Sequence, residues 1–584
     1  MNETIGTLGL LFAVTATPVC ADVGTAAAPP TGLVHTYTLA AGGTPAAYDE
    51  AMVVACLQGL INREQPVLYL FSEESEFPKY WWDKLLCEGR WLRGKRPQPV
   101  AGIDELVRLA GDRVKGAVIW DPEVPATVNV ATTIAGVEDL VVLSPELAEA
   151  HLSGWGLPLC HDLRDKFDGH ETGSKKNDAY RWALREYLAE GKCSSHFLSL
   201  YEDAWSMRAS GDLGYVVVRD WAVKNRSFVF DLSPWGDERP ADDTQQTLGL
   251  DRETFRMILA ETQRQARRKH LTEVAGFVAY DKYTFQRSLV TRKDATATEW
   301  ETVYLMSPYG AYQNTVITNC YNQSFHSAAP FAPLKQHRPA KIPPLEDKSY
   351  ICAVITDFDS IMPLYSLLPG LWDDPARGTI PLGWGVDPNL IETYPDIITY
   401  LYETASEHDY FVADASGAGY FNPSRVPPRH LSRLVRHNRH FFDLTDMSIA
   451  VMVLDWEQPS ARVKNAYAQF APDGYGTQLY DYHYAGGNSV APHVWKGMPI
   501  TNFFNDVCHF TSPQAAAHTM RHSLRARGFT LPAFGIWRFV YTSPTDVKET
   551  MAILSKDFPE INAEVVDPYT FFRLFKEWRL GLPE

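Results

Sequence analysis

Carboxylates recur in the last third of this 584-residue chain, each just after a short apolar run. Two facing carboxylates can exchange protons with a glycosidic bond or attack it, so paired acids are typical of sugar hydrolysis. The acids with this placement are Asp357, Asp359, Asp387, Asp414 and Asp455. One Asp after a strand is often only the N-cap of the next helix, as we expect for Asp567. The recurrence of acids after several apolar runs is therefore stronger evidence for a functional site than any single acid is.

We expect Asp359 and Asp414 to be the reacting pair, one as acid and the other as base or nucleophile, with Asp357 holding the geometry. Asp387 and Asp455 are the next candidates. Aromatic rings suit stacking on the apolar faces of sugars. The expected substrate-binding residues are Trp384, Gly417, Gly419, Tyr420, Trp456, Glu457, Asp481, His483 and Trp537.

Eight buried strands with interleaved helices must bring these residues together. The apolar runs are 350–356, 379–385, 410–416, 448–456, 477–483, 499–504, 533–540 and 563–568. Their number and spacing predict a (β/α)-barrel, in which the carboxyl ends of all strands meet at one mouth. No helix is predicted between the fifth and sixth strands, so the barrel is irregular, and an open doubly wound sheet stays as the alternative.

Smaller modules precede the barrel. Residues 34–165 alternate helix and strand signals and predict an α/β domain, whereas residues 166–330 mix helices with β-rich runs such as 215–220 and predict an α+β region. An acidic loop at 233–243 is expected to be solvated. Residues 331–348 are rich in proline and predict an extended linker before the C-terminal domain, 349–584. The fold class is thus α/β, with a barrel-like domain after α/β and α+β modules.

Composition and charge exclude some partners. The 71 acidic and 54 basic residues give a net charge of −17, which disfavours nucleic acid and anionic membranes. Residues 5–19 are apolar and are followed by small residues, so 1–21 are expected to be a signal peptide of a secreted or periplasmic protein. No other run suits membrane insertion. A nucleotide motif and a metal-ligand cluster are absent from the sequence, so no cofactor and no metal are expected.

The segment from Gly417 to Pro423, GAGYFNP, resembles the signature of the GxGYxYP family of glycoside hydrolases, with Asn422 in place of the second Tyr. Further similar stretches are 58–63, 129–136, 232–243 and 383–388, so the resemblance runs from about residue 34 to the C-terminus. It implies an exported carbohydrate-active enzyme with a carbohydrate substrate. The family has an SDGDN-like run after the first strand of this domain. Here the run at 356–360 is TDFDS, which keeps both acids and replaces the Gly and Asn.

Two alternatives remain open. The first is metal-dependent carbohydrate deacetylation, because an Asp-x-Asp after a strand can begin a metal site that His residues complete. His518 and His522 share one face of a predicted helix, although a solvated outer face suits them better. The second is carbohydrate binding without catalysis, since a cleft rich in aromatic residues can bind a sugar without reacting with it.

Overall fold

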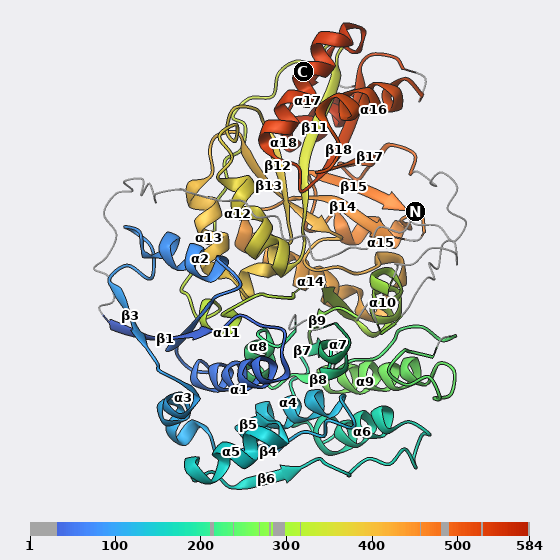
Figure 1. Cartoon of the computed structure of the whole chain (residues 1–584). Coiled ribbons are helices and arrows are strands. Elements are labelled where there is room, and N and C mark those ends of the chain that lie inside the picture. The colour runs from blue at the N-terminus through green and yellow to red at the C-terminus, as the bar shows by residue number, and fades with distance from the viewer. Residues whose placement is uncertain are drawn as a thin grey trace.

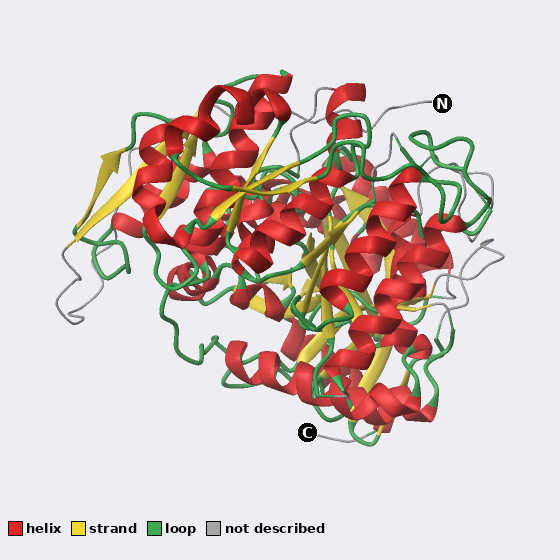
Figure 2. Ribbon diagram, turned by 90° about the horizontal axis from the view of Figure 1, so that it is seen from below, coloured by secondary structure: helices red, strands yellow, loops and turns green. Residues whose placement is uncertain are grey.

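The computed structural model describes residues 32–210, 215–237, 239–267, 269–278, 282–283, 298–315, 317–455, 457–479, 490–526 and 529–581. The expected signal peptide and the candidates Trp456, Asp481 and His483 lie outside these residues. A C-terminal domain forms the upper half of the molecule in Figure 1, and the N-terminal modules form the lower half. Most strands lie inside a layer of helices (Figure 2). No helix among the described residues is long and apolar enough to cross a membrane.

The first module is a three-stranded parallel sheet with the order β2-β1-β3. Its elements are β1 (Gly32–Leu39), α1 (Pro45–Ile61), β2 (Leu68–Ser72), α2 (Phe77–Leu86) and β3 (Lys95–Pro99). Thr44 begins α1 by accepting a hydrogen bond from the backbone N–H of Ala47 at 3.2 Å. Gln58, at the buried end of α1, donates to Asn322 at 2.7 Å. This bond joins the 58–63 stretch to a segment far along the chain.

The second module is another parallel sheet, with the order β5-β4-β6. Its elements are α3 (Ile103–Ala110), η1 (Gly111–Arg113), β4 (Gly116–Ile119), α4 (Thr127–Glu138), β5 (Leu140–Leu143), α5 (Pro145–Trp155) and β6 (Leu159–Asp162). The region expected to form one α/β domain, 34–165, thus contains two separate sheets.

The middle region contains a four-stranded sheet with the order β10-β9-β7-β8. Its elements are α6 (Lys175–Ala183), η2 (Leu184–Leu188), β7 (Phe197–Leu200), α7 (Ala204–Ser210), α8 (Arg219–Lys224), β8 (Phe228–Phe230), α9 (Leu250–Ala266), β9 (Thr272–Gly276), α10 (Thr298–Met306), η3 (Ser307–Tyr309), β10 (Ala311–Asn314) and α11 (Gln323–His326). Every strand pair is parallel, so this module is α/β and not the expected α+β. The run at 215–220 leads into α8 instead of forming a strand.

The loop at 233–243 was expected to be solvated, and this expectation is wrong for its last acids. Asp242 is almost fully buried and forms ion pairs with Lys176 at 3.0 Å and with Lys282 at 3.1 Å. Lys282 is completely buried and also pairs with Asp203 and Asp231. A buried charge is tolerated only when it is paired, so this network fixes the loop against the carboxyl ends of β7 and β8.

The C-terminal domain is built on parallel strands that close into a barrel of seven, which confirms the barrel prediction. Its strands are β11 (Ser349–Phe358), β12 (Leu382–Val386), β13 (Asp409–Ala415), β14 (Ile449–Asp455), β15 (Gly474–Leu479), β17 (Met498–Cys508) and β18 (Ala533–Val540). The order runs β12-β13-β14-β15-β17-β18-β11, and β11 pairs back with β12 from Val354 onward. Where no helix was predicted, β16 (His493–Trp495) makes an antiparallel pair with β17.

The eighth predicted strand does not enter the ring. It is β19 (Ala563–Val565), which pairs with Ser349 to Ile351 at the beginning of β11. One edge of β11 is occupied by β18, and β12 takes the carboxyl end of the other edge. Only the first residues of that second edge are left for β19, so the ring closes with seven strands at its mouth.

Helices and short turns surround the barrel. They are η4 (Pro363–Leu367), α12 (Leu368–Trp372), η5 (Pro388–Glu392), α13 (Pro395–Thr404), η6 (Pro423–Arg425), α14 (Pro428–Thr445), α15 (Ala461–Tyr467), α16 (Pro513–Ala526), α17 (Pro544–Asp557), η7 (Pro559–Ile561) and α18 (Pro568–Leu580). The proline-rich segment 331–348 packs along this domain. Leu334 N–H donates to the carbonyl of Leu444 at 2.7 Å, and Gln336 hydrogen bonds with both backbone groups of Phe411.

Candidate active site

The end of β11 places Asp357 at the barrel mouth in a left-handed backbone conformation, with φ 75°. Its N–H donates to the Asp414 carboxylate at 2.8 Å, and its carbonyl accepts from the Tyr541 hydroxyl at 3.2 Å. Its own carboxylate forms an ion pair with Arg538 of β18. Left-handed conformations are rare for residues other than Gly, Asn and Asp. The contacts on both backbone groups hold Asp357 in this conformation.

Asp359, like Asp357, is partly exposed at the mouth, whereas Asp387 and Asp414 are fully buried. It accepts a hydrogen bond from the Ser360 hydroxyl at 2.9 Å. Desolvation, and then the negative charge of Asp357, raise the pKa of Asp359 to about 6, although Arg538 opposes the shift. This carboxyl can therefore carry a proton near neutral pH.

Asp414, at the end of β13, lies completely buried beneath Asp357. Glycine at position 385 leaves space for it, since a Cβ there would lie 2.7 Å from Asp414 Oδ2. Burial, followed by the charges of Asp359 and Asp357, raises the pKa of Asp414 well above its usual range. Asp414 is near enough for the charge of Asp359 to act on it, but it sits behind the surface of the mouth.

Asp387 follows β12 and is also fully buried. It occupies the N-cap position of η5 without making a capping hydrogen bond, so capping does not explain it. One carboxylate oxygen accepts from the N–H of Gly419 at 3.2 Å, and the other has no hydrogen-bond partner in the described part of the chain. Burial and the charges of Asp359 and Asp414 raise its pKa well above the usual range.

The GAGYFNP segment forms the contact between the middle module and the barrel. A Cβ on Gly417 would lie 2.4 Å from Asn438 Oδ1, and a Cβ on Gly419 would lie 2.2 Å from Tyr312 of β10. Tyr420 pairs with Gln313 of β10 through two backbone hydrogen bonds of 2.8 and 3.0 Å. Both glycines have positive φ, so any side chain would be strained as well as obstructed.

The expected sugar contacts of this segment are corrected by its packing. Gly417 and Gly419 face protein atoms, and Tyr420 is only 1% exposed within the apolar core of the barrel. Their role is to position Asp387 and the middle module. Asp455 likewise supports the segment, because its carboxylate accepts from the backbone N–H of Ser424 at 2.9 Å and from the Ser424 hydroxyl.

Trp384 and Trp537 do not face the mouth. Both are fully buried in the core between the barrel wall and the helices. The Trp384 indole N–H donates to Asp409 at 2.9 Å, and its ring lies 5.0 Å from that of Trp372. Side chains alternate along a strand, and these two tryptophans occupy outward positions, which corrects their expected role in sugar binding. Glu457 is exposed just after β14.

Two residues were missed by sequence reasoning, one at the mouth and one between the middle module and the barrel. Arg538 contacts both Asp357 and Asp506, the second at 3.3 Å. A lone cation within the apolar run of β18 was the signal that could have revealed it. Glu273 of β9 is buried and accepts from Tyr312 at 3.2 Å, and burial together with the charge of Glu392 raises its pKa to about 7. No motif marks Glu273.

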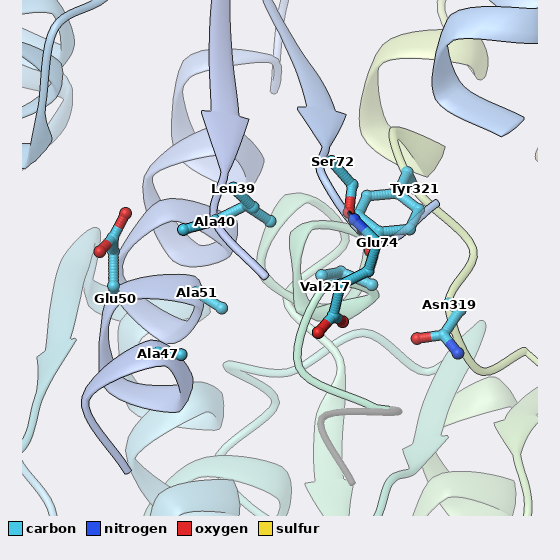
Figure 3. Close-up of a pocket in the computed structure, with 10 residues that line it drawn as sticks. All are labelled: Leu39, Ala40, Ala47, Glu50, Ala51, Ser72, Glu74, Val217, Asn319 and Tyr321. Atoms are coloured by element: carbon cyan, nitrogen blue, oxygen red, sulfur yellow. Dashed lines mark hydrogen bonds between the residues drawn. The ribbon is translucent and has the colours of Figure 1, made fainter. Parts of the chain in front are cut away.

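A separate pocket lies at the carboxyl ends of β1 and β2 (Figure 3). Its cavity volume is about 30 Å³, which is room for one or two water molecules and not for a sugar ring. Two of its polar groups already have partners, because Glu50 accepts from Tyr37 at 2.7 Å and Ser72 accepts from Tyr321 at 3.1 Å. The barrel mouth is therefore the better candidate site.

The histidines considered for a metal site lie elsewhere. His518 and His522 are on the exposed face of α16, outside the barrel. Among the described residues, no three His, Cys, Asp or Glu side chains are grouped as a metal ion would require. Asp567 caps α18 as expected, because it accepts from the N–H groups of Tyr569 and Thr570, each at 2.9 Å.

The fold and site define a class of multi-module α/β proteins with a parallel barrel whose mouth is lined by carboxylates. Two family models match the chain: "GxGYxYP putative glycoside hydrolase C-terminal domain" over residues 347–576 and "GxGYxYP_N second domain" over residues 114–191. The chain belongs to this GxGYxYP family.

A solved structure shares this fold. The crystal structure of a putative hydrolase from Bacteroides thetaiotaomicron VPI-5482 superposes with a TM-score of 0.67 at 17% sequence identity. The similarity covers 95% of this chain and 96% of that chain. At this level of identity it shows the fold alone. No curated protein matches the chain.

Proposed function

We propose that this protein hydrolyses glycosidic bonds in an oligo- or polysaccharide. The observation that carries the proposal is Asp359, a partly exposed residue at the barrel mouth whose carboxyl has a pKa raised to about 6. A general acid works best when its pKa is close to the working pH. Asp359 can thus donate its proton to the oxygen of the departing sugar, and membership of the GxGYxYP family supports this chemistry.

Asp357 is the partner that the geometry favours. Its carboxylate is 20% exposed and paired with Arg538, whereas Asp414 is completely buried. We therefore assign to Asp357 the role of base or nucleophile that the sequence suggested for Asp414. Asp414 becomes a positioning residue, because it holds the backbone N–H of Asp357. Asp387 holds the GAGYFNP segment in the same way, through Gly419.

Export belongs to the same proposal, since a polysaccharide substrate is met outside the cell. The apolar run at 5–19 supports it. N-terminal sequencing of the mature protein, purified from its natural host, tests it: a chain that begins near Asp22 is the expected result.

A glycan screen tests the hydrolysis. The full chain is incubated with plant, algal and host glycans, and NMR follows the anomer of the first product. We expect at least one glycan to be cleaved by the native protein and not by Asp359→Asn at equal thermal stability. A retained anomer assigns Asp357 as nucleophile, and an inverted anomer assigns it as base. Binding without cleavage by the native protein contradicts the proposal and favours a carbohydrate-binding protein.

A further inference from the structure

Of the aromatic residues expected at the mouth, those that the structure describes, Trp384, Tyr420 and Trp537, are buried, whereas one ring near the end of β17 is exposed. Phe510 is 79% exposed, more than any other large apolar side chain among the described residues. It follows β17 at the carboxyl end, which in a parallel barrel is the mouth. A single exposed apolar residue is common and needs no explanation by itself. The position of Phe510 relative to the acids distinguishes it from other exposed apolar residues.

The strand register places Phe510 one step beyond Asp357. Cys508 pairs with Val540, and Val540 pairs with Thr356, so these three residues lie at one level of the barrel. At the next level are His509, Tyr541 and Asp357. The hydrogen bond from His509 N–H to the Val540 carbonyl, 3.0 Å, continues the pairing of β17 with β18 to this level.

Aromatic rings connect the acids to Phe510. The Tyr541 hydroxyl donates to the carbonyl of Asp357. The Tyr541 ring centroid lies 6.4 Å from that of His509, and the His509 centroid lies 5.3 Å from that of Phe510. Tyr541 is half-buried, whereas His509 and Phe510 are exposed. The three rings, which we call the aromatic path, run from the acids to the rim of the mouth.

The end of the aromatic path is held in place by backbone hydrogen bonds. Phe510 lies in a turn that the N–H of Thr511 closes by donating to the Cys508 carbonyl at 2.8 Å. The hydroxyl of Ser512 then accepts from Ala515 N–H at 3.3 Å, at the beginning of α16. A backbone that is already ordered loses little entropy on binding, which favours affinity. The exposed ring of Phe510 is suited to a ligand with an apolar face.

The charges near the aromatic path select the kind of sugar. Asp506 is exposed, and its carboxylate contacts only one cation among the described residues, Arg538, which Asp357 shares. Asp357 and Asp506 thus share a single arginine, so the carboxylates outnumber this cation. A uronate or sulfated sugar would be repelled here, whereas carboxylates accept hydrogen bonds from neutral sugar hydroxyls.

We propose that the aromatic path is a distal subsite that binds the next sugars of a neutral pyranoside chain, with Phe510 as the outer stacking platform. This inference rests on the proposed glycoside hydrolysis and names its substrate class. It predicts that Phe510 contributes to the binding of long substrates and not of short ones, since only a long chain reaches from Asp359 to the rim.

The test compares chain lengths in Phe510→Ala and Phe510→Trp. Probes are di- and hexasaccharides of β-glucan, xylan, mannan and chitin, with oligogalacturonides as acidic counterparts. For the hydrolysed glycan we expect Phe510→Ala to lower kcat/KM about tenfold on the hexasaccharide and less than twofold on the disaccharide. Phe510→Trp should restore hexasaccharide turnover, and oligogalacturonides should not be cleaved. Phe331→Ala is the matched control, because Phe331 is 43% exposed in the proline-rich segment.

Each other outcome has a distinct meaning. Equal losses on both chain lengths, or none on either, overturn the subsite while leaving the hydrolase in place. Cleavage of oligogalacturonides in preference to neutral chains overturns the choice of substrate class. If the native protein neither binds nor cleaves any probe, the proposed function itself is contradicted and the subsite goes with it.

Discussion

At the scale of single residues, the site depends on which carboxyls keep a proton. Asp387 and Asp414 are fully buried and have strongly raised pKa values, whereas Asp357 is paired with Arg538. Asp359 has a pKa of about 6. Groups whose environments separate their pKa values are suited to different roles in acid and base catalysis. The proton donor Asp359 and its charged partner Asp357 can thus both lie at the carboxyl end of β11.

The exchange of Asp414 by Asn separates the two possible pairings. Asn at 414 keeps an oxygen that can accept from Asp357 N–H, so we expect kcat to stay within about tenfold of the native value. Asp357→Asn should lower kcat by about 10²-fold or more, because it removes the reacting carboxylate. Steady-state kinetics on the glycan found by screening gives the answer. If Asp414→Asn is the more damaged variant at equal stability, Asp414 is the reacting partner.

The pH dependence of hydrolysis follows from the pKa of Asp359. A proton donor acts only while it is protonated, so activity should be full well below pH 6 as far as this group is concerned. As pH rises above about 6, kcat/KM should fall tenfold for each pH unit. A pH profile of kcat/KM, recorded in a series of buffers, measures this fall in activity. A profile that rises through pH 6 to 8 would instead identify Asp359 as the base.

At the scale of elements, β10 and the GAGYFNP segment form a tight contact between the middle module and the barrel. We expect Gly419→Ala to destabilise the protein by about 2 to 4 kcal/mol, since the new Cβ would overlap Tyr312 at a positive φ. Thermal or urea unfolding measures this. The matched control is Gly154→Ala in α5, where nothing lies within 4 Å and the helix should gain up to about 1 kcal/mol. Equal effects of the two changes would show that the contact between β10 and the GAGYFNP segment does not stabilise the protein.

The positions of the strands could be predicted from the sequence more fully than the directions in which their side chains point. All eight apolar runs of the C-terminal domain form strands, and the acids of the first three meet at one mouth. The period of the strands could not show that Trp384 faces outward, because its neighbours at 383 and 385 are glycines without a side-chain signal. Glu273 was not predictable either, since only the docking of two modules brings it near Glu392.

At the scale of the whole molecule, several carboxyls that are protonated when folded link stability to pH. The pKa values of Asp220 and Asp359 are raised to about 6, and that of Glu273 to about 7, in each case chiefly by burial. In the unfolded chain such groups lose their protons near pH 4. The folded state then binds more protons between these values, so the free energy of unfolding should fall as pH rises from about 5 to 7.5.

Glu273→Gln isolates one of these groups. Gln is uncharged at every pH, so the variant should lose part of the decline in stability between pH 5 and 7.5, up to about 3 kcal/mol for a shift of this size. Chemical unfolding at both pH values measures the difference. Glu149→Gln, at an exposed position of α5, is the control and should keep the native slope. An unchanged slope in Glu273→Gln would show that Glu273 is ionised in the folded protein.

The most direct test of Asp359 as proton donor compares leaving groups in Asp359→Asn. A dinitrophenolate leaves without protonation, whereas a sugar alkoxide needs the acid. On an oligosaccharide of the cleaved glycan, the account predicts a loss in kcat/KM of about 10²- to 10⁴-fold. On the dinitrophenyl glycoside of the same sugar, it predicts a kcat/KM close to that of the native protein. An equal loss on both substrates, or no loss on the oligosaccharide, would show that Asp359 is not the proton donor.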